Sequence, residues 1–201
     1  MVSAIVLAAG ESTRMGAPKA LLPDPAGRPL VARIVRAFAE AGVTDAVVVT
    51  GLQHGAIVAG VTADQPPTMP RFARNVDQAR GPLSSLWVGL DAVMCSDLDV
   101  VLMTLVDVPM VLPSTIRAVV DAWRRTGAPI VRPAIGDRHG HPVLFDRSVF
   151  DELRRAPLAL GAKAVVRAHA GRLVNVVVED EGCLVDIDTP ADYDAILRKT
   201  T

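Results

Sequence analysis

The sequence predicts an α/β fold of three layers, in which a mostly parallel, twisted sheet lies between two layers of helices. Short apolar runs rich in β-branched residues recur at 2–6, 46–50 and 100–105, as buried parallel strands require. Amphipathic helical patterns separate these runs, so we expect right-handed crossover connections between neighbouring strands. The chain has 201 residues, which suits one domain of this class, so we expect residues 1–201 to form a single domain.

Composition excludes several classes of function. The chain has 21 Lys and Arg against 22 Asp and Glu, a formal net charge of −1, whereas a general nucleic-acid binder carries a basic excess. The longest apolar stretch, 100–112, is interrupted by Asp107 and is too short to span a membrane. Cys95 and Cys183 form no C-x-x-C pair, and no signal peptide is recognisable. We therefore expect a cytoplasmic protein with reduced thiols.

The first loop, residues 7–19, reads Leu-Ala-Ala-Gly-Glu-Ser-Thr-Arg-Met-Gly-Ala-Pro-Lys. It follows the first strand, at the edge of the sheet where open α/β folds bind ligands. Gly10 and Gly16 allow the backbone to approach a ligand closely, and successive N–H groups can form an anion nest. Arg14 and Lys19 add two cations, so the loop is typical of a polyphosphate site. A connecting loop with two solvated cations is the alternative, and the loop has neither the P-loop nor the dinucleotide fingerprint.

The next segments complete a β-α-β unit. Apolar residues at helical spacing over 30–38 precede Gly42, a residue typical of a helix C-terminus. The strand 46–50 ends at Gly51, which places this glycine on the same sheet edge as the first loop. A short helix over 54–60 and a strand over 72–75 are expected to follow.

A second loop follows, from Asn75 to Ser85, with a Gly81-Pro82 turn. Ser84 or Ser85 is expected to cap the helix that begins there. An ordinary helix cap is one interpretation of this segment. A second ligand loop beside the first is the other.

Asp107 comes directly after the central apolar strand, 100–105. An acidic residue there is costly unless it is exposed or paired. At the carboxyl edge, facing a phosphate loop, it is suited to hold Mg²⁺, which typically takes one or two carboxylates plus substrate phosphates. A turn or capping aspartate is the alternative.

The second half of the chain continues the alternation. A helix is expected to begin at Pro113 and to end at Gly127, and strands are expected over 129–133 and 173–178. His139 and His141 lie between these strands without a third ligand at suitable spacing, so the sequence does not favour zinc.

The last motif is Asp-Ile-Asp-Thr-Pro at 186–190. Thr189 as N-cap with Asp192 three residues later makes a sound helix start. Capping does not account for Asp186 and Asp188, which alternation places on one side of an extended segment.

Residues 7–19 resemble the signature of the MobA-like nucleotidyltransferases, and Ala9 resembles the MocA-type branch, the molybdenum cofactor cytidylyltransferases. Gly-Pro-Leu-Ser-Ser at 81–85, Leu-x-Asp-x-Pro at 105–109, Gly-His-Pro-Val-Leu-Phe at 140–145 and the 186–190 motif match the family in the same order. The chain departs from the family at Val108, where Gln is frequent, and before Gly161, where a Gly-Asp pair is usual.

The resemblance implies a fold like that of the nucleotide-diphospho-sugar transferases and an activity that moves a nucleoside monophosphate, CMP from CTP by preference, onto a phosphate-bearing acceptor of the molybdopterin type. It implies Mg²⁺ as cofactor, held by Asp107 and Asp188 with Asp186 in reserve, and acceptor binding at His141. Catalytic roles fall to Arg14, Lys19 and Asp107. The implied nucleotide-binding residues are Leu7, Ala8, Ala9, Gly10, Arg14, Lys19, Gly51, Asn75, Gly81, Pro82, Ser84 and Ser85.

Several alternatives to this function stay open at this point. A guanylyltransferase of molybdopterin or a sugar-phosphate nucleotidyltransferase would use the same motifs. A non-catalytic nucleotide-binding or cofactor-binding chaperone would keep the fold without the chemistry. If the acceptor or bound cofactor is molybdopterin, the macromolecular partner would be a molybdoenzyme or a maturation protein.

Overall fold

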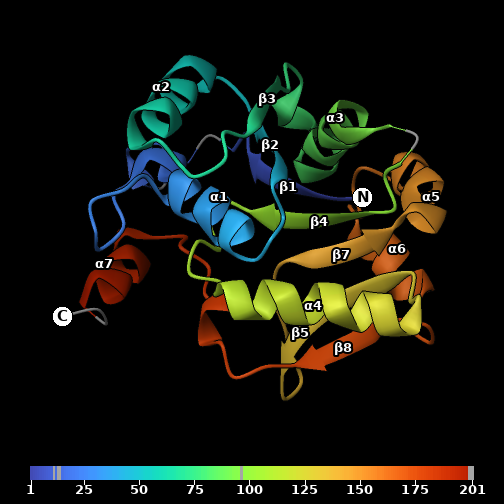
Figure 1. The fold of residues 1–201 in the computed structure, drawn as a ribbon. Helices are drawn as coiled ribbons and strands as arrows, with labels where there is room; N and C mark the ends of the chain where they lie inside the picture. The colour runs from blue at the N-terminus through green and yellow to red at the C-terminus, as the bar shows by residue number, and fades with distance from the viewer. Residues whose placement is uncertain (11, 13–14, 96, 199–201) are drawn as a thin grey trace.

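The computed structural model describes residues 1–10, 12, 15–95 and 97–198. Within them one eight-stranded sheet has the order β3-β2-β1-β4-β7-β5-β6, and β8 pairs with β5 (Figure 1). The strands are β1 Val2–Ala8, β2 Asp45–Thr50, β3 Arg71–Arg74, β4 Val100–Leu105, β5 Ile130–Ile135, β6 Arg138–His139, β7 Val143–Asp146 and β8 Val174–Val177. The helices are α1 Leu30–Glu40, α2 His54–Asp64, α3 Pro82–Val93, α4 Pro113–Thr126, α5 Phe150–Arg155, α6 Lys163–Ala168 and α7 Pro190–Arg198. Short 3-10 turns are η2 Lys19–Leu21, η3 Gln78–Arg80, η4 Arg147–Val149 and η5 Glu181–Cys183.

The two faces of the sheet carry separate apolar cores, which confirms the three-layer prediction. Along β1, Ala4 and Val6 face the core under α1 and α4, whereas Ile5 and Leu7 face the core under α3, α5 and α6. Figure 1 shows α1 and α4 together on one side of the sheet, with α3 and α5 on the other. A Cβ on Gly89 would lie 2.5 Å from Ile5 Cγ2, so this glycine allows α3 to approach β1 closely.

Strands β1 to β4 pair in parallel, as their apolar runs predict, but β7 is antiparallel to both β4 and β5. The sequence analysis did not predict this strand. Parallel neighbours need a crossover of a dozen or more residues, and only seven residues, 136–142, separate β5 from β7. The chain therefore returns through β6, in antiparallel pairing with β5.

The C-terminal segment closes over the carboxyl edge of the sheet. Ile187 is fully buried and forms a third apolar cluster with Leu30 and Ile196 of α7. Its backbone N–H donates to the carbonyl of Asp107 at 2.8 Å. This contact holds the 186–190 motif against the loop that follows β4.

Most predicted element ends agree with the structure to within one or two residues, with two differences. Helix α2 extends to Asp64, four residues beyond its expected end. The prediction that Ser84 or Ser85 caps α3 is wrong, because α3 begins at Pro82 with Gly81 as N-cap and both serines lie inside the first turn. Pro at the first helical position has no N–H to be satisfied, so the helix starts earlier than a serine cap would allow.

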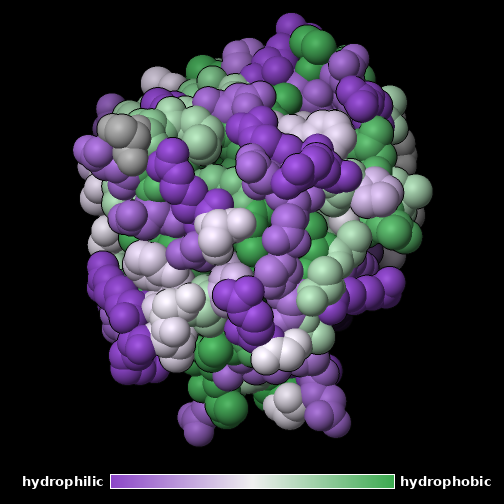
Figure 2. All heavy atoms as spheres, turned by 90° about the vertical axis from the view of Figure 1, so that its right-hand side faces the viewer, coloured by the Kyte–Doolittle hydropathy of each residue, from purple (hydrophilic) through white to green (hydrophobic). Residues whose placement is uncertain are grey.

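None of the helices in the described residues is both long enough and apolar enough to cross a membrane. On the face shown in Figure 2, hydrophilic side chains surround small groups of apolar ones. Some large apolar side chains are exposed, such as Leu52 and Val76, which is normal for a protein surface.

Candidate active site

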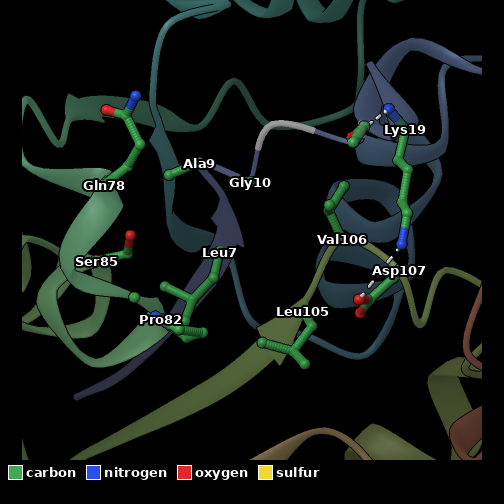
Figure 3. A pocket seen from close by; sticks show the side chains of 12 residues that line it. Leu7, Ala9, Gly10, Lys19, Gln78, Pro82, Ser85, Leu105, Val106 and Asp107 are labelled. Carbon is green, nitrogen blue, oxygen red and sulfur yellow. Dashed lines mark hydrogen bonds and ion pairs between the residues drawn. The ribbon is translucent and has the colours of Figure 1, made fainter. Parts of the chain in front are cut away.

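A cleft of about 260 Å³ lies where β1 and β4 end. Its two sides differ in character (Figure 3). Neutral side chains from η3 and α3 form one side, and Lys19 and Asp107 form the other, with Leu7 and Leu105 between them. The lining residues are Leu7, Ala9, Gly10, Ser12, Lys19, Gln78, Gly81, Pro82, Ser85, Leu105, Val106 and Asp107.

Lys19 is the cation of the charged side. It begins η2, and its backbone N–H donates to Ser12 Oγ at 3.0 Å, which ties the end of the first loop to its middle. Its Nζ lies 2.7 Å from Asp188 Oδ1 and 3.9 Å from Asp107 Oδ2. The ammonium therefore bridges two carboxylates from distant parts of the chain, at the mouth of the cleft.

Asp107 is the only cleft-lining carboxylate among the described residues. Its Oδ1 is buried and has no hydrogen-bond partner within the described part of the chain. Burial raises the pKa of this carboxyl above its ordinary value; Lys19 opposes that shift, and Asp186 and Asp188 add to it. A buried carboxylate oxygen without a partner is costly, so a cation at this oxygen would be favourable.

Asp188 is positioned by the helix start that follows it. Asp192 Oδ2 accepts hydrogen bonds from the backbone N–H groups of Asp188, at 3.1 Å, and Thr189, at 2.8 Å. The Thr189 hydroxyl also donates to this oxygen, at 2.8 Å. That bond is the main reason why the pKa of Asp192 is lowered, and the backbone bonds add to the effect. The predicted cap of α7 thus orients the chain at Asp188 rather than acting on a ligand itself.

Asn75 organises the neutral side from behind. Its Nδ2 donates to both Ser84 Oγ and Ser85 Oγ at 2.9 Å, and its Oδ1 accepts from the backbone N–H of Asp77 at 2.9 Å. Of these residues only Ser85 lines the cleft. Asn75 and Ser84 are buried behind it and determine where the Ser85 hydroxyl lies.

We expect Asn75→Ala to lower the free energy of unfolding by about 1–3 kcal/mol, because it leaves the buried Ser85 hydroxyl and the Asp77 backbone N–H without their partner. The Ser84 hydroxyl keeps its bond to the Gly81 carbonyl. Chemical denaturation measures the change in the free energy of unfolding. The control is Gln53→Ala, an exposed amide before α2 that makes no side-chain cap hydrogen bond, for which we expect a change within about 0.5 kcal/mol. Equal effects of the two substitutions would contradict the role assigned to Asn75.

Gly51 contributes indirectly. A Cβ at this position would lie 2.6 Å from the carbonyl oxygen of Ala9, so only glycine lets the end of β2 pack against the first loop. Gly51 does not line the cleft, and neither does Ala8, which is buried. Both support the course of the loop.

His141 lies apart from the cleft, in a second cavity of about 530 Å³ that shares Leu7, Pro82 and Leu105 with it. Burial is the main cause that lowers the pKa of His141, and Lys163 lowers it further; a hydrogen bond to the Met103 carbonyl and the charge of Asp186 oppose this. The imidazole is therefore neutral at pH 7 and can accept or donate one hydrogen bond.

The structure thus brings together most of the residues that the sequence analysis singled out. Those that line the cleft are Leu7, Ala9, Gly10, Lys19, Gly81, Pro82, Ser85 and Asp107, while Asp188 reaches it through Lys19. Arg14 lies outside the described residues. Ser12 and Gln78 also line the cleft and were not singled out: Ser12 lies within the predicted loop, and no pattern distinguishes Gln78.

The described residues contain no group of three or more His, Cys, Asp or Glu side chains that could hold a metal ion on their own. Two carboxylates, Asp107 and Asp188, converge on one side of the cleft. Such a pair suits a hard divalent cation that takes its remaining ligands from substrate phosphates and water. The residues present therefore fit a metal shared with a bound polyphosphate.

Comparison with known proteins gives consistent matches. Residues 4–173 match the family described as MobA-like NTP transferase domain. The "Probable molybdenum cofactor guanylyltransferase" of Mycolicibacterium paratuberculosis is 27% identical over 199 residues, 98% of this chain and 95% of that protein. Rv0371c of Mycobacterium tuberculosis is 28% identical, with a TM-score of 0.82 over 98% of this chain and 97% of that one. Its crystal structure in complex with manganese, at the same identity and coverage, has a TM-score of 0.75.

The family match spans most of the chain and includes the first loop, the residues that line the cleft and Asp107; it ends before Asp188. The similar fold of Rv0371c extends over nearly the whole length of both proteins. The chain belongs to the MobA-like NTP transferase family and is a nucleotidyltransferase.

Proposed function

We propose that this protein transfers a nucleoside monophosphate, CMP from CTP by preference, to the phosphate of a molybdopterin-type acceptor and releases pyrophosphate. The observation that carries the proposal is the two-sided cleft, in which a neutral, hydroxyl-bearing side faces Lys19 and Asp107. A nucleoside triphosphate has the same division, with an uncharged base at one end and a polyanion at the other. The proposal treats residues 1–201 as one domain in the cytoplasm, where nucleoside triphosphates are available.

Phosphoryl chemistry of this kind depends on positioning and on charge stabilisation. The backbone N–H groups of the first loop and the Lys19 ammonium bind the triphosphate, together with Arg14. Asp107 and Asp188 would hold a divalent cation, Mg²⁺ in our proposal, which would neutralise charge on the phosphates. The manganese complex of Rv0371c supports a divalent cation in a protein of similar fold.

Lys19 has two successive partners in this scheme. Without substrate it is paired with Asp188 and lies near Asp107. A triphosphate offers it a competing anion, and its departure takes the Lys19 ammonium away from both carboxylates. Binding of the polyphosphate and of the metal are therefore mutually supportive.

The acceptor needs no general base in the protein. A phosphate monoester has a second pKa of about 6, so it is already ionised at pH 7. Its body lies in the second cavity in our proposal, near the neutral His141, and its phosphate reaches the cleft where the two cavities share Leu7, Pro82 and Leu105.

The preference for CTP rests on the shape of the neutral side. Ala9 is buried, and even a Cβ on Gly51 would lie only 2.6 Å from its carbonyl oxygen, so the loop has little room to retreat from a larger purine. Ser85, held by Asn75, offers a hydroxyl toward the base. GTP is the second candidate, because a relative similar over 98% of the chain is named a molybdenum cofactor guanylyltransferase.

A thermal-shift series separates these candidates. With Mg²⁺ and each nucleoside triphosphate in turn, we expect the largest shift with CTP, because groups left unpaired by the wrong base cost roughly 1–3 kcal/mol. Ligand at about 100 times its Kd stabilises the fold by roughly 2.7 kcal/mol. Ser85→Ala should reduce the difference between CTP and GTP, whereas Ser148→Ala, in η4 outside the cleft, should leave it unchanged.

A larger shift with GTP would overturn the CTP assignment in favour of the guanylyltransferase. Transfer itself is tested by pyrophosphate release from the preferred triphosphate with molybdenum-loaded molybdopterin. Tight nucleotide binding without acceptor-dependent release of pyrophosphate would contradict the enzyme and favour a nucleotide-binding carrier.

A further inference from the structure

The second cavity has a composition that an acceptor phosphate alone does not account for. Its walls are mostly apolar, from residues such as Met103 and Phe145. Four side chains with polar nitrogen atoms interrupt them, and none of the described lining residues is acidic: the four are Arg132, His139, His141 and Lys163.

Two of the four carry a positive charge at neutral pH. Burial lowers the pKa of both His139 and His141, so both imidazoles are neutral. Arg132 and Lys163 remain charged, and no ion pair joins either of them to a carboxylate in the described part of the chain. Lys163 is exposed to solvent and needs no partner, whereas Arg132 is half-buried. Arg132 is therefore the cation of this cavity that an anionic ligand would complement.

Arg132 is held in place while most of its donors stay available. It lies opposite Asn175 in the β5–β8 register, and its Nε donates to Asn175 Oδ1 at 2.9 Å. A guanidinium has five N–H donors. Its other four have no hydrogen-bond acceptor within the described residues. The side chain is half-buried, so it is both anchored and accessible from the cavity.

The distance between Arg132 and the site at Lys19 and Asp107 decides whether one anion can contact both. Val131 of β5 is in register with Leu144 of β7, which is in register with Leu102 of β4. Two strand spacings, roughly 10 Å, therefore separate Arg132 from β4. Asp107 lies further along the direction of β4, beyond its last residue, Leu105. A single phosphate beside Lys19 and Asp107 cannot also contact Arg132.

We propose that the second cavity binds a second anionic group of the acceptor, separate from the phosphate that is nucleotidylated, and that Arg132 is the residue that selects for it. The inference rests on the proposed function, which places the acceptor body in this cavity. The acceptor class is then a body that packs against the mostly apolar walls of this cavity and carries a phosphate and, separately, a second anionic group. In molybdopterin, the sulfur pair that carries the molybdenum is such a group.

The test compares two probes by direct binding, without nucleotide. One is molybdenum-loaded molybdopterin, which has both anionic groups, and the other is a pterin that carries a phosphate alone. We expect the unmodified protein to bind the first at least tenfold more tightly. Arg132→Gln should reduce this preference to threefold or less, and Arg132→Lys, which keeps the charge, should retain part of it. Arg138→Gln is the matched control, because Arg138 lies on the adjacent β6, paired with Glu181 at 2.9 Å, and does not line the cavity.

A preference absent from the unmodified protein, or unchanged in Arg132→Gln, overturns the inference. A purely structural role for Arg132 predicts a lower melting temperature and equal weakening toward both probes, which also overturns it. The transfer assay is independent of this outcome. If the preference depends on Arg132 but no pyrophosphate is released with any nucleoside triphosphate, the second-anion site stands and the proposed transfer fails.

Discussion

Replacing Lys19 by alanine is expected to lower kcat/KM by about 100-fold or more. Loss of one preorganised donor to a developing negative charge typically has an effect of this size. Lys19 Nζ is held 2.7 Å from Asp188 Oδ1 at the mouth of the cleft, so its position is set before a triphosphate arrives. Initial rates of pyrophosphate release measure the effect.

The control for Lys19→Ala is Arg71→Ala. Arg71 forms a comparable ion pair with Asp45, at 2.8 Å, but lies on β3 away from the cleft. Arg71→Ala should leave kcat/KM within about twofold of the unmodified protein, because a surface ion pair contributes only about 0–1 kcal/mol to the stability of the fold. We expect Lys19→Ala to remain folded, since the residue lies in a short turn, and retention of full activity would remove Lys19 from the phosphate site.

Asp107→Asn is expected to abolish the dependence of nucleotide binding and turnover on a divalent metal, with a loss of activity of about 100-fold or more. A metal that stabilises the charge of the reacting phosphates is worth several kcal/mol, and each 1.4 kcal/mol is a tenfold change. The substitution removes the charge at nearly constant volume. Titration of turnover with Mg²⁺ measures the effect, and an unchanged titration would exclude Asp107 as a ligand.

The same variant should be at least as stable as the unmodified protein when metal is absent. Burial raises the pKa of Asp107 in the folded state. At a pH between the ordinary and the raised pKa, the folded protein therefore keeps a proton that the unfolded chain has released. Stability from that proton is present at low pH and is lost as the pH rises through the raised pKa. At pH 7 the ionised carboxylate therefore destabilises the metal-free fold. Without metal, the difference between the melting temperatures at pH 4 and pH 7 should be smaller in Asp107→Asn than in the unmodified protein.

Asp188→Asn provides the comparison for the second ligand. Its side chain is 46% exposed, against 27% for Asp107, so its loss should weaken metal binding less. An Asp188→Asn variant with unchanged metal titration, beside an affected Asp186→Asn variant, would transfer the second ligand to Asp186.

The sequence by itself determined the strands and helices up to α4, together with β5, β8 and α7, and the two loops at the sheet edge; it did not predict β6, β7, α5 or α6. Those features depend on residues close in the chain: alternating or continuous apolar runs, glycines after strands, and the Thr189–Asp192 helix start. Hydrogen bonds within a helix or a turn join near neighbours, so their pattern can be recognised locally. The antiparallel β7 escaped prediction, because its direction depends on the length of a return connection and on the space left between β4 and β5.

The tertiary structure alone decided which charged side chains meet at the site. Lys19 meets Asp188 across 169 residues of sequence, and burial of Ile187 under α7 brings that segment to the carbonyl of Asp107. The structure also placed Ser85 in the cleft and Ser84 behind it, a distinction that depends on which side of the first turn of α3 each serine occupies. Pairings of this kind result from the packing of distant elements around one core, and short-range patterns in the chain contain no record of them.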